Sequence, residues 1–508
     1  MLRTLLVLFV AALAAVILQA GQSGPALLFE VSLDLSLPAQ PPGRLLVVIA
    51  SSDGIEPRLL IGRTGRNAAL TAGIDAPALV PGDSVILDAT VAAFPIQNLA
   101  DLPVGEYYVQ AFLSTNPDIR SHSAPGNLYS EPLRVALDLV QNVPVHLLLT
   151  RQVPDEQLPP DEGHLRFIKI QSDLLSEFHD RPIYLRAGII LPRGYDQDPE
   201  QRYPLRVHIG GYGGRYASVR TMMRPGSPFR DAWLADDMPR MVLLHLDGAG
   251  PYGDPYQVNS HNNGPYGDAV TQELIPYVER KFRGVGEPHA RVLDGGSTGG
   301  WVSLALQIFY PDFFNGAWAS CPDSVDFHAF QLVDIYDGDS AYVDKQGNEL
   351  SSARNQDGSV RFTMRHEVQM ENVLGLGGRW TLSGRQWGAW NAAYGPRGEG
   401  GRPVPLWNSE TGLIDRSVIK HWKQYDLRAV LEQNWDELAL KLRGRLRIWV
   451  GEMDDYFLNN AVHLLDEFLQ TRPSIDARIS YGHERGHCWT GISQNEMMRE
   501  MGERTSAR

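Results

Sequence analysis

The chain is short of cysteine and of basic residues, and both shortages exclude classes of protein. Only 2 of its 508 residues are cysteines, Cys321 and Cys488, which are too few for a fold built on disulfides. Lysine and arginine number 46 against 60 aspartates and glutamates, which gives a formal net charge of -14. Because binding to phosphate groups depends on clustered basic side chains, we expect no nucleic-acid partner and no binding to anionic lipid.

Long hydrophobic runs are also missing, except at the N-terminus. Arg3 precedes an unbroken apolar run over 5–18, and small or polar residues follow it. This pattern predicts a signal peptide over residues 1–20, cleaved near Ala20. A membrane anchor is the alternative, although the run is short for the roughly 30 Å of hydrocarbon in a bilayer. We therefore expect a periplasmic or secreted protein that has no membrane contact once the signal is removed.

Length and composition predict a soluble protein of two or three folded units. Hydrophobic residues make up 43% of the chain and charged residues 21%, as in ordinary folded proteins, and 508 residues are too many for one core. Strand-like alternation between turns rich in Gly, Pro and Asp predicts a small β-sandwich over residues 26–152. A proline-rich, acidic linker, 154–163, follows this β domain.

From residue 163 onward strand-like segments alternate with helical ones, which predicts a doubly wound, mainly parallel α/β sheet. Its predicted strands are Phe167–Gln171, Ile183–Leu191, Leu205–Ile209, Met241–Leu246, Arg291–Leu293, Leu446–Val450 and Ala477–Tyr481. A helix is predicted over 459–469. Between residues 327 and 443 the apolar periodicity fades and tryptophan accumulates. We expect this insertion, 327–443, to form a lid or substrate-binding layer, or alternatively an aromatic-rich insert that only adds stability.

A Gly-x-Ser-x-Gly pentapeptide, Gly295–Gly299, lies between a short apolar strand and apolar residues at helical spacing. With 49 glycines in the chain the pentapeptide alone is weak evidence, and its alternative reading is a structural turn. A strand, a sharp turn and a helix together predict a nucleophile elbow at Ser297, where side chains two residues away would clash across the turn. The helix N-terminus also favours negative charge that develops on the serine.

A serine nucleophile needs a base, and the base needs an orienting acid. In this type of sheet the acid follows the serine in the chain and the histidine comes last. Asp454 directly follows an apolar strand, at the edge where such sheets keep their sites, so we predict that it is the acid, with Asp455 as the alternative. His487 lies in a loop after the last predicted strand and is the predicted base, with His483 as its rival.

The negative oxygen of a tetrahedral intermediate needs hydrogen-bond donors. The backbone N–H of Thr298 is one candidate, because it follows the nucleophile. The glycine-rich loop Gly210–Gly214 follows a predicted strand and can turn in a second amide, for which we favour that of Tyr212. A phosphate-binding role for this loop is weak, because it has neither the dinucleotide nor the P-loop spacing.

From about Phe167 to the C-terminus the sequence resembles the putative-esterase family of α/β-hydrolases, which includes S-formylglutathione hydrolase, feruloyl and enterochelin esterases and mycolyl transferases. The motifs that carry the resemblance are Gly210–Gly214, Asn262–Asp268 leading into Glu273–Pro276, the Ser297 elbow and Gly486–Trp489. The resemblance implies an α/β-hydrolase fold over 163–508, a triad of Ser297, Asp454 and His487, and oxyanion amides from Tyr212 and Thr298. The insertion is longer than small family members carry and the β domain is an addition, so the substrate class does not carry over.

The two cysteines and a few scattered metal-binding side chains allow further hypotheses. Cys488 adjoins the predicted base, and Cys321 follows a further predicted strand, 316–319, at the same edge of the sheet. The two cysteines therefore either form a disulfide or are buried, inert thiols. The spacing of His245, His261 and Asp337–Asp339 matches no zinc or EF-hand pattern. We therefore expect neither a metal nor another cofactor, and leave room only for an incidental calcium.

These residues predict a serine esterase that hydrolyses a small-molecule or glycan-linked ester through an acyl-enzyme. Acyl transfer to a sugar or alcohol would use the same residues and is one alternative. The other is a binding protein whose hydrolase fold no longer catalyses. Composition does not decide between the substrates, and it does not give the role of the β domain.

Overall fold

The computed structural model describes residues 28–506 except 89, 98 and 138–143, so the predicted signal peptide lies outside the described residues. The chain divides into two compact units. The first consists of Met1–Ile61, Ala69–Leu113 and Leu128–Arg151, and the second of Gly62–Ala68, Ser114–Asn127 and Gln152–Arg508. Among the helices that the structure describes, none combines the length and the apolar character needed to cross a bilayer.

The first unit is a β-sheet domain. Its strands follow the order β4-β1-β9-β7-β6-β2-β3-β5, and β8 pairs with β6. Every second residue of β1 (Phe29, Val31 and Leu33) is buried in one hydrophobic core, which explains why alternation in the sequence predicted strands. The strands are β1 (Phe29–Leu33), β2 (Gly43–Ala50), β3 (Leu70–Ala76), β4 (Ser84–Leu87), β5 (Ala92–Phe94), β6 (Gly105–Ser114), β7 (Leu128–Ser130), β8 (Leu133–Leu137) and β9 (Val145–Gln152).

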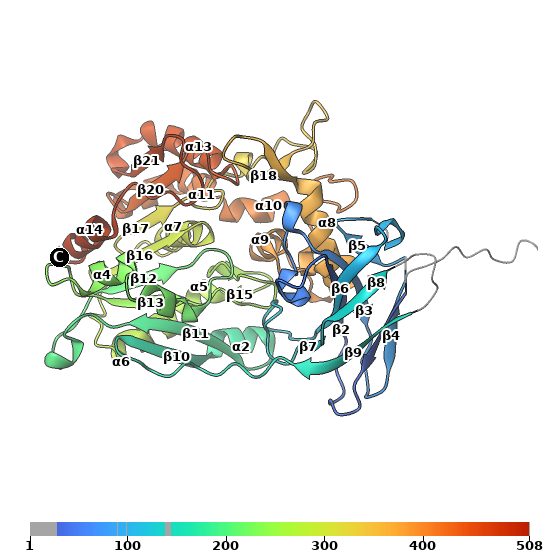
Figure 1. The fold of residues 1–508 in the computed structure, drawn as a ribbon. Helices are drawn as coiled ribbons and strands as arrows, with labels where there is room; N and C mark the ends of the chain where they lie inside the picture. The colour runs from blue at the N-terminus through green and yellow to red at the C-terminus, as the bar shows by residue number, and fades with distance from the viewer. Residues whose placement is uncertain (1–27, 89, 98, 138–143, 507–508) are drawn as a thin grey trace, which may run out of the picture. The chain divides into compact units, whose positions relative to one another are not determined.

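The second unit contains the predicted doubly wound sheet. Figure 1 shows its eight strands in the order β10-β11-β13-β12-β16-β17-β20-β21. From β13 onward neighbouring strands run parallel, while β11 is antiparallel to both β10 and β13. The strands are β10 (Leu165–Ser172), β11 (Ile183–Ile190), β12 (Leu205–Ile209), β13 (Val242–Leu246), β16 (Arg291–Gly296), β17 (Ala317–Ser320), β20 (Leu446–Gly451) and β21 (Arg478–Gly482). The predicted mainly parallel α/β fold is confirmed.

Both faces of this sheet are buried. On β13, Val242 and Leu244 belong to one hydrophobic core and Leu243 to another, as expected for side chains that alternate between faces. A strand covered on both faces reads as a continuous apolar run, which is why these short strands are visible in the sequence. The helices of the unit before the insertion are α2 (Asp173–His179), α3 (Val219–Met222), α4 (Pro228–Leu234), α5 (Tyr266–Asp268), α6 (Ile275–Lys281) and α7 (Thr298–Phe309).

The insertion folds into short helices and a hairpin of β18 (Ser351–Arg354) and β19 (Val360–Thr363). Its helices are α8 (Met364–Leu374), α9 (Gln386–Tyr394), α10 (Ile419–Trp422), α11 (Leu427–Gln433) and α12 (Trp435–Lys441), and α13 (Leu458–Gln470) and α14 (Gln494–Ser506) follow it. The indoles of Trp380 and Trp407 stack at 4.6 Å and 10°, and every residue from Trp387 to Tyr394 is buried. A helix buried on all sides has no amphipathic period, which explains why the apolar periodicity fades here.

Candidate active site

The turn between β16 and α7 holds Ser297 in a backbone conformation that few non-glycine residues adopt. Ser297 has φ 58° and ψ -125°. The flanking glycines make this turn sterically feasible. A Cβ on Gly299 would lie 2.1 Å from the carbonyl oxygen of Ile209, and a Cβ on Gly295 would lie 2.4 Å from that of Gly299. The backbone therefore requires both glycines of the pentapeptide, and the serine projects from a sharp strand-to-helix turn.

Asp454 and His487 meet at the carboxyl end of the same sheet. Asp454 follows β20 and is fully buried, and its Oδ2 lies 2.8 Å from Nδ1 of His487. Its Oδ1 accepts the backbone N–H of Tyr456 at 2.9 Å and that of Leu458 at 3.3 Å. The carboxylate is thus held by the turn after β20, with one oxygen left to orient the imidazole.

The two alternative residues have other partners. Asp455 Oδ1 accepts the backbone N–H of His487 at 3.2 Å, and its Oδ2 forms an ion pair with Arg361 at 3.3 Å. Asp455 therefore contacts the histidine loop without contacting the ring. His483 is exposed and does not line the cavity that contains Ser297 and His487.

The pKa of His487 is raised above its ordinary value of 6.5. Burial by itself lowers this pKa, but the hydrogen bond and the charge of Asp454 outweigh burial, and the charges of Asp323 and Asp455 act in the same direction. The ring thus combines two properties of a general base, a fixed orientation and an increased affinity for the proton it would take.

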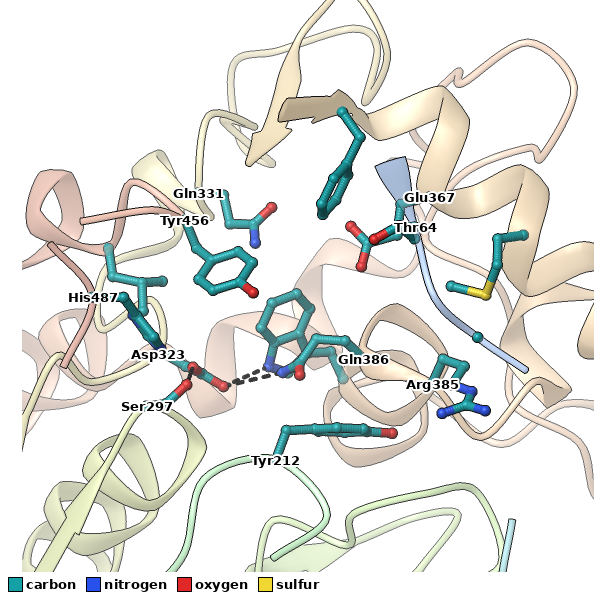
Figure 2. Close-up of a pocket in the computed structure, with 15 residues that line it drawn as sticks. Thr64, Tyr212, Ser297, Asp323, Gln331, Glu367, Arg385, Gln386, Tyr456 and His487 are labelled. Atoms are coloured by element: carbon teal, nitrogen blue, oxygen red, sulfur yellow. Dashed lines mark hydrogen bonds between the residues drawn. The ribbon is translucent and has the colours of Figure 1, made fainter. Parts of the chain in front are cut away.

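The Ser297 hydroxyl points to a carboxylate that the sequence did not single out. It donates to Oδ1 of Asp323 at 3.4 Å, and between Ser297 and His487, both described, no hydrogen bond is present. The two residues are nevertheless close neighbours. Cys321 Sγ accepts the backbone N–H of Ser297 at 3.3 Å, and a ring nitrogen of His487 lies within 4.8 Å of the same sulfur. Figure 2 shows Ser297, Asp323 and His487 grouped on one side of the cavity.

Asp323 is 3% exposed, and its second oxygen is surrounded by neutral donors. Oδ2 accepts hydrogen bonds from the Tyr256 hydroxyl at 2.7 Å, the Thr298 hydroxyl at 3.0 Å, Nε1 of Trp390 at 3.1 Å and Nε2 of Gln386 at 3.3 Å. Burial raises the pKa of Asp323, and the hydrogen bonds from Tyr256 and Thr298 act against it. Because four donors already reach Oδ2, only Oδ1 can accept a hydrogen bond from Ser297 or from a molecule in the cavity.

Two backbone amides are placed to bind an oxyanion. The loop after β12 approaches the elbow, because a Cβ on Gly211 would lie 3.9 Å from that of Ser297. Asp254 holds this loop by accepting the N–H of Gly213 at 2.9 Å. Counting only described residues as acceptors, neither the N–H of Tyr212 nor that of Thr298 donates a hydrogen bond to the protein. Free amides beside a nucleophile are the arrangement that an oxyanion hole requires.

The side chains of Ser297, Asp323 and His487 face one cavity of about 300 Å³. Ser297, Asp323 and His487 line it together with side chains of the insertion, among them Gln331, Glu367, Arg385, Gln386 and Trp390. Gly62 and Thr64 also line it, from the segment Gly62–Ala68 that belongs to the second unit. The predicted β-sandwich over 26–152 included this segment, because nothing in its local sequence distinguishes it from a turn between strands.

Cys321 and Cys488 are joined in a disulfide across 167 residues. Cys321 lies two residues before Asp323 and Cys488 directly after His487, so the bond ties the loop after β17 to the histidine loop. In the described part of the chain, the one group of three metal-donor side chains within reach of each other is Cys321, His487 and Cys488. Two of these donors are already bonded to each other, and we assign no metal.

Asp323 is the residue that sequence reasoning missed. It follows the predicted strand 316–319 by a few residues, at the carboxyl edge of the sheet, which is the signal that identified Asp454. A triad needs only one acid, and because both carboxylates lie between the serine and the histidine in the chain, the order of the chain gives Asp323 no separate role.

Comparison with known proteins identifies the family. The family model described as "Putative esterase" matches residues 184–487, more than half of the chain. The chain belongs to this esterase family. No curated protein matches the chain.

Several solved structures resemble the chain at low identity. A ferulic acid esterase has 13% identity and a TM-score of 0.40, and the match covers 68% of this chain and 99% of that one. The S-formylglutathione hydrolase of Agrobacterium tumefaciens has 13% identity, coverage of 68% and 98%, and a TM-score of 0.38. A ferulic acid esterase of Anaeromyces mucronatus, in complex with ferulic acid, has 14% identity, coverage of 69% and 94%, and a TM-score of 0.31.

Proposed function

We propose that this protein is an exported serine esterase in which Ser297 is the nucleophile, His487 the base and Asp454 the orienting acid. One observation carries the proposal. The imidazole of His487, held by Asp454 at 2.8 Å, lines the same cavity as a serine on a strained strand-to-helix turn. Family membership supports the same chemistry.

In the proposed reaction the Ser297 hydroxyl turns from Asp323 toward His487. Its oxygen bonds to the ester carbonyl carbon while its proton passes to Nε2 of His487. The carbonyl oxygen becomes an anion, which the amides of Tyr212 and Thr298 bind at a gain of about 3 kcal/mol for each donor. The alcohol then leaves with the proton from His487, and a water molecule activated by the same ring hydrolyses the acyl-enzyme.

The disulfide supports export. Disulfides persist in oxidising compartments such as the periplasm and the extracellular space. The Cys321–Cys488 bond agrees with the signal peptide expected from the sequence. Sequencing the N-terminus of the protein purified from the culture medium and from the periplasm tests export, and we expect a chain that begins just after Ala20. A chain that retains its apolar N-terminus in the membrane fraction would contradict export.

A serine-directed fluorophosphonate followed by peptide mapping tests the nucleophile. We expect one labelled peptide, containing Ser297, and hydrolysis of short aryl esters that is lost in Ser297→Ala. Labelling elsewhere, or hydrolysis that survives the substitution, would refute the assignment. Product analysis with added sugar or alcohol acceptors would separate hydrolysis from acyl transfer. A feruloyl ester among the substrates would test whether the protein acts on aromatic acyl groups.

A further inference from the structure

A buried carboxylate that forms no ion pair with a described residue faces the proposed nucleophile. Asp323 is 3% exposed, and none of the ion pairs within the described part of the chain includes it. Buried charges in proteins are normally paired, because removal from water is unfavourable unless an opposite charge or several hydrogen bonds offset it. The donors around Oδ2 are all neutral, and Oδ1 has only the Ser297 hydroxyl at 3.4 Å. Oδ1 can therefore accept a further donor, including a charged one, beside the nucleophile.

The walls of the cavity also suit a cation. Tyr212, Phe362, Trp390 and Tyr456 line it, and the faces of aromatic rings attract positive charge. Glu367, a half-buried carboxylate of the cavity wall, lies on the opposite side from Ser297 and Asp323 (Figure 2). One guanidinium, that of Arg385, also lines the cavity, and Figure 2 shows it on the opposite side from Ser297 and Asp323. At the end of the cavity that contains Ser297, Asp323 is therefore the carboxylate that a cation would meet.

We propose that Asp323 binds a protonated amine on the acyl group of the substrate, adjacent to the scissile carbonyl, so that the substrate is an amino-acyl ester. This assignment rests on the proposed esterase function and names its substrate class. An amine on the α-carbon lies about 2.5 Å from the carbonyl carbon. When that carbon approaches Ser297 Oγ, an α-ammonium can reach Oδ1, which is 3.4 Å from the same oxygen, at ordinary ion-pair distance.

Charge balance in the reaction favours the same substrate class. The attack on the ester creates an oxyanion close to the Asp323 carboxylate together with the imidazolium of His487, and the repulsion between the two negative groups disfavours the attack on a neutral ester. An α-ammonium lies between the two negative groups and offsets this repulsion. Asp323 thereby acts as a specificity-determining residue, while His487 transfers the proton and Asp454 orients the imidazole ring.

Matched esters test this inference. The benzyl esters of L-alanine and of isobutyric acid have the same shape, with an ammonium in one where the other has a methyl group. We expect kcat/KM of the wild type to be at least 10-fold higher for the alanine ester. In Asp323→Asn the ratio of the two values should fall at least 10-fold, whatever the absolute rates. Glu367→Gln is the matched control, and its ratio should change less than 3-fold.

The outcomes separate this inference from the esterase function. If the wild type hydrolyses both esters equally, or if Asp323→Asn slows both by the same factor, the amine site is refuted and the esterase survives. The benzyl ester of lactic acid has a neutral hydroxyl in place of the ammonium. If the wild type prefers it over the isobutyric ester as strongly as it prefers the alanine ester, hydrogen bonding and not charge is recognised, and the amine site is refuted. A larger effect of Glu367→Gln would move the site away from Asp323. If no ester reacts and no fluorophosphonate labels Ser297, the esterase function itself fails. Labelling of each variant checks that its elbow is folded.

Discussion

Two buried carboxylates follow neighbouring parallel strands of one sheet and have different partners. Asp454, after β20, contacts the imidazole of His487 at 2.8 Å, while Asp323, after β17, accepts from the hydroxyl of Ser297 at 3.4 Å. The first is held by backbone amides and the second by neutral side chains. The comparison shows that a place at the carboxyl edge brings an acid to the site, but that its hydrogen-bond partners decide whether it contacts the imidazole or the serine hydroxyl.

The two loops are not independent of each other. The Cys321–Cys488 disulfide joins the strand end that carries Asp323 to the loop that carries His487. A change in one loop is therefore expected to reach the other, and the predictions below separate their roles.

The largest effect is expected from Ser297→Ala, because it removes the proposed nucleophile. Activity on a short aryl ester should fall roughly 10⁴-fold or more, as when a serine nucleophile is removed from other hydrolases. The exposed Ser359→Ala, in the turn of the β18–β19 hairpin, is the control and should keep full activity. Substantial activity in Ser297→Ala would show that Ser297 is not the nucleophile, and the roles assigned to Asp454 and Asp323 would then fail as well.

Asp454→Asn is expected to have the next largest effect. Its kcat should fall roughly 10²- to 10⁴-fold, because the imidazole loses its orienting acid. The base acts only when neutral, so activity falls as the pH drops below the raised pKa of His487. Asp454→Asn removes the main group that raises this pKa, while the burial that lowers it remains. The pKa of His487 should therefore fall, and the acid limb of the kcat/KM profile should move to lower pH.

Asp455→Asn is the matched control for Asp454→Asn, because the carboxylate of Asp455 contacts the backbone N–H of His487 and not its ring. It should change kcat by less than 10-fold. A greater loss in Asp455→Asn than in Asp454→Asn would reverse the assignment of the orienting acid.

Removing the disulfide tests whether the two loops act together. The double variant Cys321→Ser, Cys488→Ser should lose about 2–4 kcal/mol of unfolding free energy, because the bond closes a loop across 167 residues. Activity should also fall several-fold as the histidine loop loosens. Denaturant unfolding and kinetics measure both effects. Thiol counting of the denatured, non-reduced wild type should find no free thiol, and two free thiols would show that the bond does not form.

The smallest effect expected is a pH shift in Asp323→Asn. The charge of Asp323 contributes to the raised pKa of His487, but less than the hydrogen bond and charge of Asp454 do. The acid limb of kcat/KM on a neutral ester should therefore move to lower pH, by less than in Asp454→Asn. A larger shift in Asp323→Asn would identify Asp323, and not Asp454, as the main electrostatic partner of the base.

Much of the fold could be read from the sequence, because its signals are local. The predicted strand Leu205–Ile209 coincides with β12, and the helix predicted over 459–469 is α13, Leu458–Gln470. Strands covered on both faces appear as short apolar runs, and an amphipathic helix appears through its period. The helices of the insertion could not be predicted in this way. The helix α9, which contains Trp387 and Trp390, is buried on all sides and therefore shows no amphipathic period.

The sequence by itself determined the elbow at Ser297, since only glycine leaves room for the carbonyl oxygens that cross it, and it determined the order of serine, acid and histidine. Only the tertiary structure placed Asp454 rather than Asp455 against the ring of His487, aimed Asp323 at the serine, and brought Thr64 to the cavity wall. The physical reason is range. Steric limits on a turn act between neighbours in the chain, whereas the partners of a buried carboxylate come from strands, loops and insertions that are far apart in sequence and meet only after folding.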